Sequence, residues 1–414
     1  MEQSIIENID NPQMLEKLYR ENKQEFSKYF NKIYESYNSD LVNFWKLRLS
    51  SEQETGFKEI FKLDLLVVIF ISLITWLLVK IPIIFPQIQE ETFYIKDLAI
   101  IVFNGIILYV FWQNRISNKK NIILYFLTIL ILLFYVNFLP YQNSDSAMLA
   151  FIHVPLLLWC IFGLSFLSFD YKNITQRINF IRFNGELLIM SGLILIAGGL
   201  LTAITLGLFA SIEMDIEKFY FNYVAALGAV ASPIISYYLI RLYPNITSKI
   251  APVIARVFTP LVLITLAIYL VSLIFSNNKI IEDRDLLIVF NFMLLAVLAL
   301  IVFSVAELDK SKEKNIYILI LLALALLTII INSIALIAII ARVANGFTPN
   351  RTVVLVSNIL IFLNLILITR SLYLSYFKSH SLDSVEKAVV IYLPIYFLWT
   401  IIVIFILPFV FEFK

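Results

Sequence analysis

The sequence has few of the residues that build disulfides, metal sites and charged surfaces. It contains one cysteine, Cys160, and two histidines, His153 and His380, among 414 residues. A single cysteine excludes an intrachain disulfide and a thiolate metal site, and two distant histidines argue against a zinc site. Charged residues make up only 15% of the chain and its net charge is +2, which argues against nucleic acid as a partner. We therefore expect no metal and no nucleic acid.

Motifs of the common catalytic and nucleotide-binding folds are also missing. We find no phosphate loop, no Gly-rich strand–helix turn, no nucleophile elbow and no His-Glu-x-x-His pair, and so expect no cofactor. No acid or base lies in the middle third of any long apolar run. Because a proton- or sodium-coupled transporter usually has one there, its absence argues against that mechanism. Uncharged asparagines do lie in such runs, and we expect most of them to be interhelical hydrogen-bond partners: Asn104, Asn137, Asn222, Asn291, Asn332, Asn358 and Asn364.

What the chain does have is long apolar runs. Hydrophobic residues make up 60% of it, and its mean hydropathy is +0.87. A hydrocarbon core about 30 Å thick needs about 20 apolar residues in a helix. We predict eleven such helices, at residues 63–85, 97–113, 121–139, 147–169, 186–211, 219–242, 253–276, 286–306, 316–341, 352–374 and 388–411. The predicted fold is an all-α, polytopic membrane helical bundle (63–414), preceded by a small helical segment (1–62).

The loops between these runs alternate between rich and poor in Lys and Arg. Of the 32 Lys and Arg, 24 fall in the N-terminal segment and in the loops after every second span, such as Lys310, Lys312 and Lys314. The positive-inside rule then places the N-terminus in the cytoplasm and the C-terminus outside. Because a missed or invented span would break this alternation, it also supports the number eleven.

Residues 1–62 are the only sizeable polar part of the chain. Asn11-Pro12 is a typical helix start, and apolar residues such as Leu15, Tyr19 and Phe26 then recur at helical spacing. This pattern predicts a cytoplasmic amphipathic helical tail. Either it covers the cytoplasmic face of the bundle, or it recruits a soluble protein partner or lies on anionic lipid.

Three groups of residues are candidate sites. The first is a polar cluster at the cytoplasmic face, in which we expect Glu186 to pair with Arg182 or Arg256. The second is a stretch rich in small residues, either the tightest helix pair of the bundle or a broken helix lining a cavity: Gly198, Gly199, Ser232 and Pro233. The third is an outer loop able to bind lipid phosphate, loop acids or an anionic ligand: Arg342, Asn345, Thr348, Asn350 and Arg351.

In that outer loop we expect Gly346 to end one helix in the left-handed conformation. Thr348 is then expected to cap the next helix, and Pro349 fits its first turn.

Several motifs together resemble a known family. They are Asn345-Gly-Phe-Thr-Pro-Asn-Arg351, Gly185-Glu-Leu-Leu with Gly198-Gly-Leu-Leu-Thr202, Tyr392-Leu-Pro-Ile-Tyr-Phe-Leu-Trp399, and in the tail Asn11-Pro-Gln-Met-Leu-Glu-Lys-Leu-Tyr-Arg20 with Phe44-Trp-Lys-Leu-Arg48. From about residue 11 to its end the chain resembles the multi-spanning bacterial family known as domain of unknown function 4153. The resemblance implies a multi-pass protein of the bacterial cytoplasmic (inner) membrane and carries over no catalytic role.

Three functions agree with this sequence. The favoured one is a transporter-like or lipid-handling bundle without catalysis, whose partners are membrane lipids. The alternative is a membrane scaffold or sensor that engages a soluble partner through residues 1–62. A membrane-embedded enzyme that modifies lipid is the least favoured.

Overall fold

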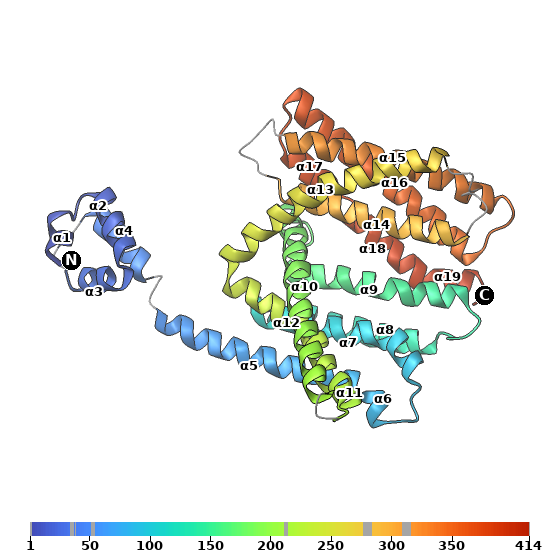
Figure 1. The fold of residues 1–414 in the computed structure, drawn as a ribbon, viewed down its shortest axis with the longest axis horizontal. Coiled ribbons are helices and arrows are strands. Elements are labelled where there is room, and N and C mark those ends of the chain that lie inside the picture. The colour runs from blue at the N-terminus through green and yellow to red at the C-terminus, as the bar shows by residue number, and fades with distance from the viewer. Residues whose placement is uncertain are drawn as a thin grey trace. The chain divides into compact units, whose positions relative to one another are not determined.

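The chain is described here from a computed structural model that covers residues 2–33, 37, 39–50, 54–210, 214–275, 284–308 and 316–413 (Figure 1). Every regular element among these residues is a helix, in agreement with the predicted all-α class. The chain divides into two compact units, Met1–Val67 and Val68–Lys414. The predicted cytoplasmic loop with Lys310, Lys312 and Lys314 lies outside the described residues.

Short helices make up most of the N-terminal unit: α1 (Glu2–Glu7), α2 (Pro12–Glu21), α3 (Lys23–Ile33) and α4 (Asp40–Ser50), followed by the start of α5 (Glu54–Val79). The Asn11 side chain accepts hydrogen bonds from the backbone amides of Gln13 and Met14. It therefore caps α2, with Pro12 as the first helical residue, as the sequence predicts.

The apolar stripe of this unit packs on itself. Tyr19, Phe26 and Trp45 are 2% exposed or less, and the Trp45 ring centroid lies 5.0 Å from that of Phe26 and 5.2 Å from that of Tyr19. The Arg48 guanidinium lies 4.6 Å from the Trp45 ring centroid and donates a hydrogen bond of 2.7 Å to Glu16. The residues behind the predicted amphipathic pattern thus form a hydrophobic core of their own.

The second unit contains the long apolar helices. Its first part comprises the rest of α5, then α6 (Ile81–Ile84), α7 (Glu90–Gln113), α8 (Lys119–Phe138), α9 (Asp145–Phe166), α10 (Ile174–Ala210), α11 (Glu217–Phe219), the π-helix η2 (Tyr220–Ala225) and α12 (Ala226–Leu242). Its second part comprises α13 (Pro244–Phe275), α14 (Arg284–Ala306), α15 (Ile316–Val343), α16 (Pro349–Lys378), α17 (Asp383–Val390), α18 (Leu393–Ile401), the π-helix η3 (Ile402–Ile406) and α19 (Leu407–Val410).

Nine helices in the described part of the chain are long and apolar enough to cross a membrane. Two shorter apolar helices, Leu63–Val79 and Phe290–Ala306, stand where the sequence predicts the first and eighth spans. A helical bundle with membrane-length helices is therefore confirmed, whereas the count of eleven and the cytoplasmic N-terminus stay predictions.

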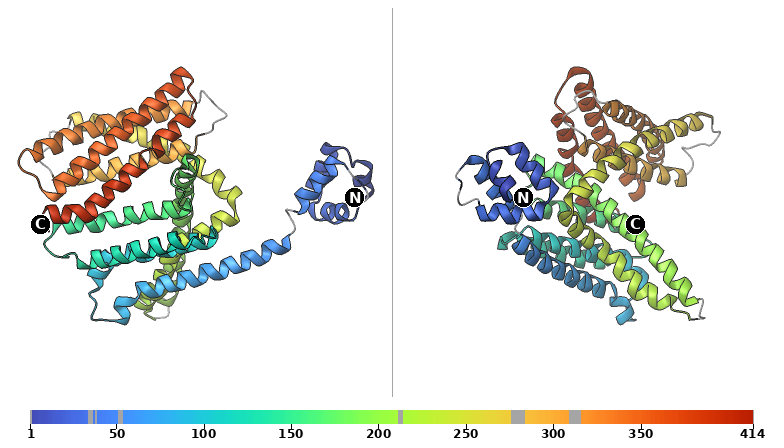
Figure 2. Two further views of the ribbon diagram at one scale, coloured as in Figure 1. Left: turned by 180° about the vertical axis from the view of Figure 1, so that it is seen from behind. Right: turned by 60° about the vertical axis from the view of Figure 1, so that its left-hand side comes forward.

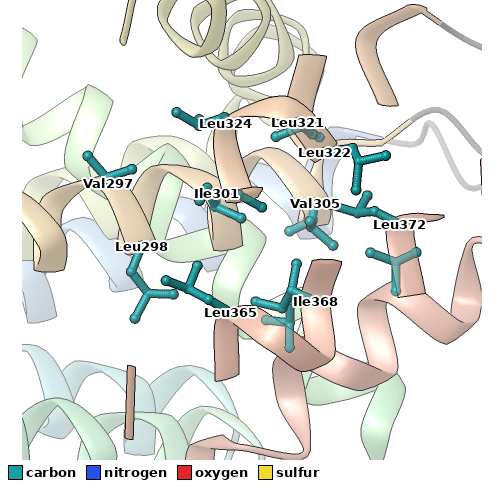
Figure 3. Close-up of a cluster of buried hydrophobic side chains, with 14 of the residues drawn as sticks. Val297, Leu298, Ile301, Val305, Leu321, Leu322, Leu324, Leu365, Ile368 and Leu372 are labelled. Carbon is teal, nitrogen blue, oxygen red and sulfur yellow. The ribbon is translucent and has the colours of Figure 1, made fainter. Parts of the chain in front are cut away.

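The main hydrophobic core of the second unit lies between α14, α15 and α16 (Figure 3). Its side chains recur every three or four residues along each helix, so each helix presents one stripe to the others. Labelled examples are Val297, Leu298, Ile301, Val305, Leu321, Leu322, Leu324, Leu365, Ile368 and Leu372. On the other side of the unit, α9 packs against α7 and against the α18–η3 segment (Figure 2).

Asparagines link the helices across this core, as predicted. Asn358 donates from Nδ2 to Asn291 Oδ1 at 2.9 Å, and Asn332 donates to the Asn358 carbonyl at 3.2 Å. Asn364 donates to the Tyr396 hydroxyl at 3.0 Å. Such bonds contribute on average about 0.6 kcal/mol each in membranes, so they add directionality to packing that is otherwise set by shape.

The helix α10 differs from the predicted span in its start and from the other candidate spans in its burial. It begins at Ile174 instead of residue 186, because the Asn173 side chain accepts a hydrogen bond from the Gln176 amide and the helix forms before the apolar run. Further along, residues 195–201 are all exposed. No residue in the most apolar window of α10 is buried, whereas 17% to 56% are buried in the corresponding windows of the other candidate spans. The distal part of α10 is thus an apolar surface on every side.

Candidate functional site

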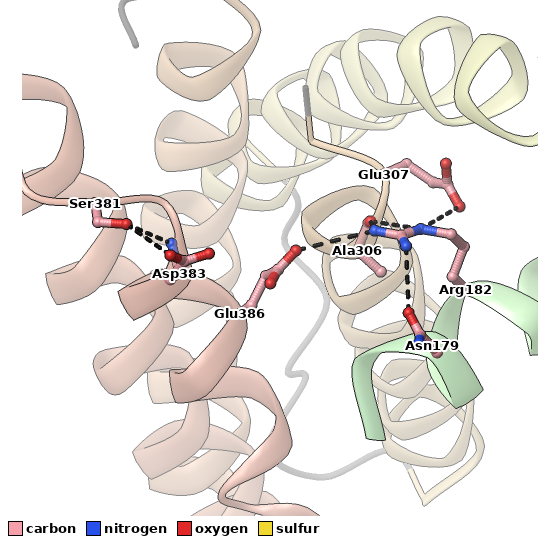
Figure 4. Close-up of polar contacts among 7 residues, drawn as sticks. All are labelled: Asn179, Arg182, Ala306, Glu307, Ser381, Asp383 and Glu386. Carbon is pink, nitrogen blue, oxygen red and sulfur yellow. Dashed lines mark hydrogen bonds and ion pairs between the residues drawn. The ribbon is translucent and has the colours of Figure 1, made fainter. Parts of the chain in front are cut away.

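A polar cluster joins α10, the end of α14 and α17 (Figure 4). We name it the Arg182 cluster and define it by Asn179, Arg182, the Ala306 carbonyl, Glu307 and Glu386. Arg182 Nε lies 3.6 Å from Glu307 Oε1, and Arg182 Nη2 lies 3.9 Å from Glu386 Oε1. One guanidinium is therefore shared between two carboxylates that come from different elements.

The closest contacts of Arg182 are to a helix end. Its Nε and Nη2 atoms donate to the Ala306 carbonyl at 3.1 and 2.5 Å, and Nη1 donates to Asn179 Oδ1 at 3.5 Å. Ala306 is the last residue of α14, and the last carbonyls of a helix lack partners within it. A cation there satisfies such a carbonyl and also interacts favourably with the helix dipole. Arg182 thus fixes the end of α14 against α10.

Both carboxylates of the cluster are largely withdrawn from solvent. The Glu307 side chain is 6% exposed and that of Glu386 is 10% exposed. Burial is the main reason why the pKa of Glu307 rises from 4.5 to about 7. The positive charge of Arg182 opposes this rise, Glu186 adds to it, and Arg256 opposes it. Glu307 therefore titrates near neutral pH.

A residue outside the predicted cytoplasmic-face cluster, Glu307, is affected by the charges of all three predicted members. Arg182, Glu186 and Arg256 all act on Glu307 through their charges. Arg182 forms ion pairs with Glu307 and Glu386, which lie far from it in sequence. Glu307 directly follows an apolar run and Glu386 lies in a short polar stretch, so each resembles an ordinary loop charge.

The predicted helix break is wrong at Gly198 and Gly199. The helix α10 continues through both glycines to Ala210, and a Cβ at either position would meet no atom within 4 Å. Pro233 lies inside the continuous helix α12, and the buried Ser232 hydroxyl donates to the Ala229 carbonyl at 3.0 Å. Because the hydroxyl supplies a local hydrogen bond beside the proline, the α-helix persists there.

Close contact between helices occurs at Gly185 and Gly163 instead of at Gly198 and Gly199. A Cβ at Gly185 would lie 1.8 Å from the Phe303 ring, and one at Gly163 would lie 2.9 Å from the Phe180 ring. Small residues at 198 and 199 therefore do not form the tightest helix pair, since nothing approaches them.

The outer loop has the predicted local conformation. Gly346 has a φ of +113°, and Thr348 caps α16 by accepting from the Arg351 amide, with Pro349 as its first residue. Asn350 donates to Asp145 at 2.6 Å, so the loop is tied to an acid at the start of α9.

The two arginines of this loop differ in position. Arg351 donates from Nη1 to the Gly346 carbonyl at 2.9 Å, within its own loop. Arg342 lies in the last turn of α15, where its charge favours the helix end, and Asn345 is exposed. An anionic ligand for this loop stays a prediction.

A second set of buried polar residues lies at the start of the second predicted span. The predicted start of that span is wrong. The helix α7 begins at Glu90 instead of residue 97, so Lys96 and Asp97 are part of it, and both are 6% exposed. Lys96 donates to the Leu139 carbonyl at 2.7 Å, just beyond the end of α8, and Asp97 accepts from Asn137 at 2.8 Å. These residues secure the end of α8.

His153 is buried within a helix. It lies inside α9, is 8% exposed, and its Nδ1 bonds the Leu149 carbonyl at 2.8 Å. Among the residues that the structure describes, no group of three or more His, Cys, Asp or Glu is placed to hold a metal ion.

No protein-family model, characterised protein or solved structure matches this chain. The resemblance to domain of unknown function 4153 therefore stays a prediction from the quoted motifs.

Proposed function

We propose that this chain is a multi-pass, transporter-like protein of the bacterial cytoplasmic membrane that moves membrane lipid without transforming it chemically. The observation that supports the proposal most is the exposure of residues 195–201 on every side of α10. A helix that is apolar all round is stable only where apolar material surrounds it.

The length of α10 and the position of its charges are compatible with binding a membrane lipid. From Glu186 to Leu201 the helix rises by about 22 Å, more than the roughly 15 Å of hydrocarbon in one leaflet. The charged groups Arg182 and Glu186 lie at one end of this stretch and the exposed apolar surface at the other. A lipid with a zwitterionic headgroup is likewise charged at one end and apolar along its acyl chains.

The test is lipid movement in vesicles that contain the purified protein and a fluorescent phosphatidylethanolamine. Dithionite added outside quenches only the outer leaflet of protein-free vesicles. We expect it to quench nearly all the lipid when the protein is present, and Glu186→Gln to slow this movement. Asp383→Asn, which changes an exposed acid on α17, serves as the matched control. Quenching limited to the outer leaflet with protein present would contradict the proposal.

The alternative is a scaffold or sensor that binds a soluble partner through residues 1–62. It is favoured by the hydrophobic core within the N-terminal unit, around Tyr19, Phe26 and Trp45, because such a core supports a folded module. Deletion of residues 1–50 would then abolish the cellular function, whereas Glu186→Gln would leave it intact. The lipid proposal predicts the opposite pattern, and two variants that both behave as wild type would contradict both functions.

A further inference from the structure

The Arg182 cluster contains more negative than positive charge. Its one cation, Arg182, faces two acids, Glu307 and Glu386, while Glu186 and Arg256 act on Glu307 through their charges. The Arg182 guanidinium makes its shortest contacts to the Ala306 carbonyl, and its distances to the Glu307 and Glu386 carboxylates are longer, 3.6 and 3.9 Å.

Glu307 has the more deeply buried side chain of the two acids paired with Arg182, 6% exposed against 10% for Glu386. Its Oε1 atom is buried and receives no hydrogen bond from the residues that the structure describes. An ionised carboxylate buried without donors is costly, whereas a protonated one carries no net charge. The protonated form of Glu307 therefore suits this environment better.

The groups around Glu307 come from several elements. The helix α10 contributes Arg182 and Glu186, α13 contributes Arg256, and α17 contributes Glu386 through their shared contact with Arg182. From α15, Tyr317 interacts with the Glu307 charge, and its hydroxyl lies 3.0 Å from Thr259 Oγ1.

We propose that Glu307 is a proton-binding site that controls how firmly α17 is held against α10. When the Glu307 carboxylate accepts a proton from water, a new O–H bond forms and its negative charge disappears. Arg182 then has Glu386 as its main anionic partner, and the attachment of α17 to α10 becomes stronger. This inference concerns the same part of the molecule as the proposed function but does not require lipid movement.

The simplest alternative ligand is an alkali cation, because two carboxylates also suit such an ion. Experiment distinguishes it from a proton. A cation would occupy the cluster while both acids stay ionised, whereas a proton converts one acid to its neutral form. The two ligands therefore differ in the infrared signal of the carboxyl group and in their dependence on sodium.

The first experiment is an infrared pH titration of the full-length protein in lipid vesicles. We expect a carboxylic-acid C=O band that appears with a midpoint near neutral pH, is lost in Glu307→Gln and persists in Asp383→Asn. Because an opposite charge lowers the pKa of an acid by about 1–3 units, Arg182→Gln should raise the midpoint by at least about one pH unit. Glu307→Asp keeps a titrating acid and covers the case in which the glutamine variant fails to fold.

Other outcomes of the titration would overturn the proposal. One is a band unchanged in Glu307→Gln, and another is a midpoint that moves when choline replaces sodium, which would assign the site to a cation. If lipid moves but the carboxylic-acid band is absent, this inference alone is refuted. If the band is present but lipid does not move, the proposed function alone is refuted.

The second experiment measures amide hydrogen exchange in α17, corrected for the intrinsic effect of pH. We expect exchange in the wild type to slow by roughly fivefold on going below neutral pH, since an ion pair of this kind contributes on the order of 1 kcal/mol. In Glu307→Gln the α17 amides should exchange slowly at every pH, and in Glu386→Gln they should exchange fast at every pH. In Asp383→Asn their exchange should depend on pH as in the wild type. Equal pH dependence in all four proteins would contradict the proposed role of α17.

Discussion

Replacing Glu307 by glutamine should stabilise the protein at alkaline pH. In the folded chain burial raises the pKa of Glu307 to about 7, whereas in the unfolded chain it returns towards its ordinary value of 4.5. The folded state therefore binds the proton more tightly. The stability that this proton contributes is fully present below the unfolded pKa and is lost as the pH rises through about 7.

The size of this effect follows from the shift. A change from 4.5 to about 7 at 1.36 kcal/mol per unit corresponds to a loss of at most about 3 kcal/mol. Glutamine has nearly the same shape as a protonated glutamate but cannot ionise. We therefore expect Glu307→Gln to match the wild type below about pH 4 and to exceed it by up to about 3 kcal/mol at about pH 8.

The assay is reversible unfolding in mixtures of mild detergent and dodecyl sulfate, followed by far-ultraviolet circular dichroism at each pH. Asp383→Asn controls for the loss of an acid at an exposed position of the neighbouring helix. The reasoning is refuted if wild type and Glu307→Gln lose stability in parallel between these pH values, or if the variant is the less stable one at alkaline pH.

Further substitutions at four positions test the packing and the α16 cap. Gly185→Ala should cost about 1–3 kcal/mol in the same unfolding assay, because its Cβ would overlap the Phe303 ring, whereas Gly198→Ala, which meets open space within a helix, should cost nothing and stabilise by up to about 1 kcal/mol. Trp45→Ala should destabilise the N-terminal unit by about 3–5 kcal/mol, measured as lost amide protection in α2, and unchanged protection would contradict the core described for it. Thr348→Ala should cost about 1 kcal/mol through loss of the α16 cap, whereas Thr348→Ser should retain the cap.

Local features of the fold could be predicted from the sequence because their causes are local. The cap at Asn11 and the turn from Gly346 to Pro349 depend on residues within one helical turn, and the structure confirms both. The apolar runs similarly predict membrane-length helices because their length alone matches the bilayer.

The site could be predicted only in part because its members are distant in sequence. Arg182 contacts the Ala306 carbonyl across 124 residues, and no local pattern distinguishes Glu307 from a solvated loop charge. The glycines show the same limit, since a glycine within an apolar run does not reveal which side of its helix another helix covers. Gly185 is in contact with Phe303, whereas Gly198 and Gly199 are open.

The most direct test of the membrane architecture is cysteine labelling in intact and permeabilised cells. With Cys160 replaced by serine, single cysteines are placed at Asp10, Ser311 and Asn345 and treated with an impermeant maleimide. We predict that the cysteine at 345 reacts in intact cells and that those at 10 and 311 react only after permeabilisation. Labelling of 10 and 311 from opposite sides would contradict the eleven spans and the cytoplasmic N-terminus.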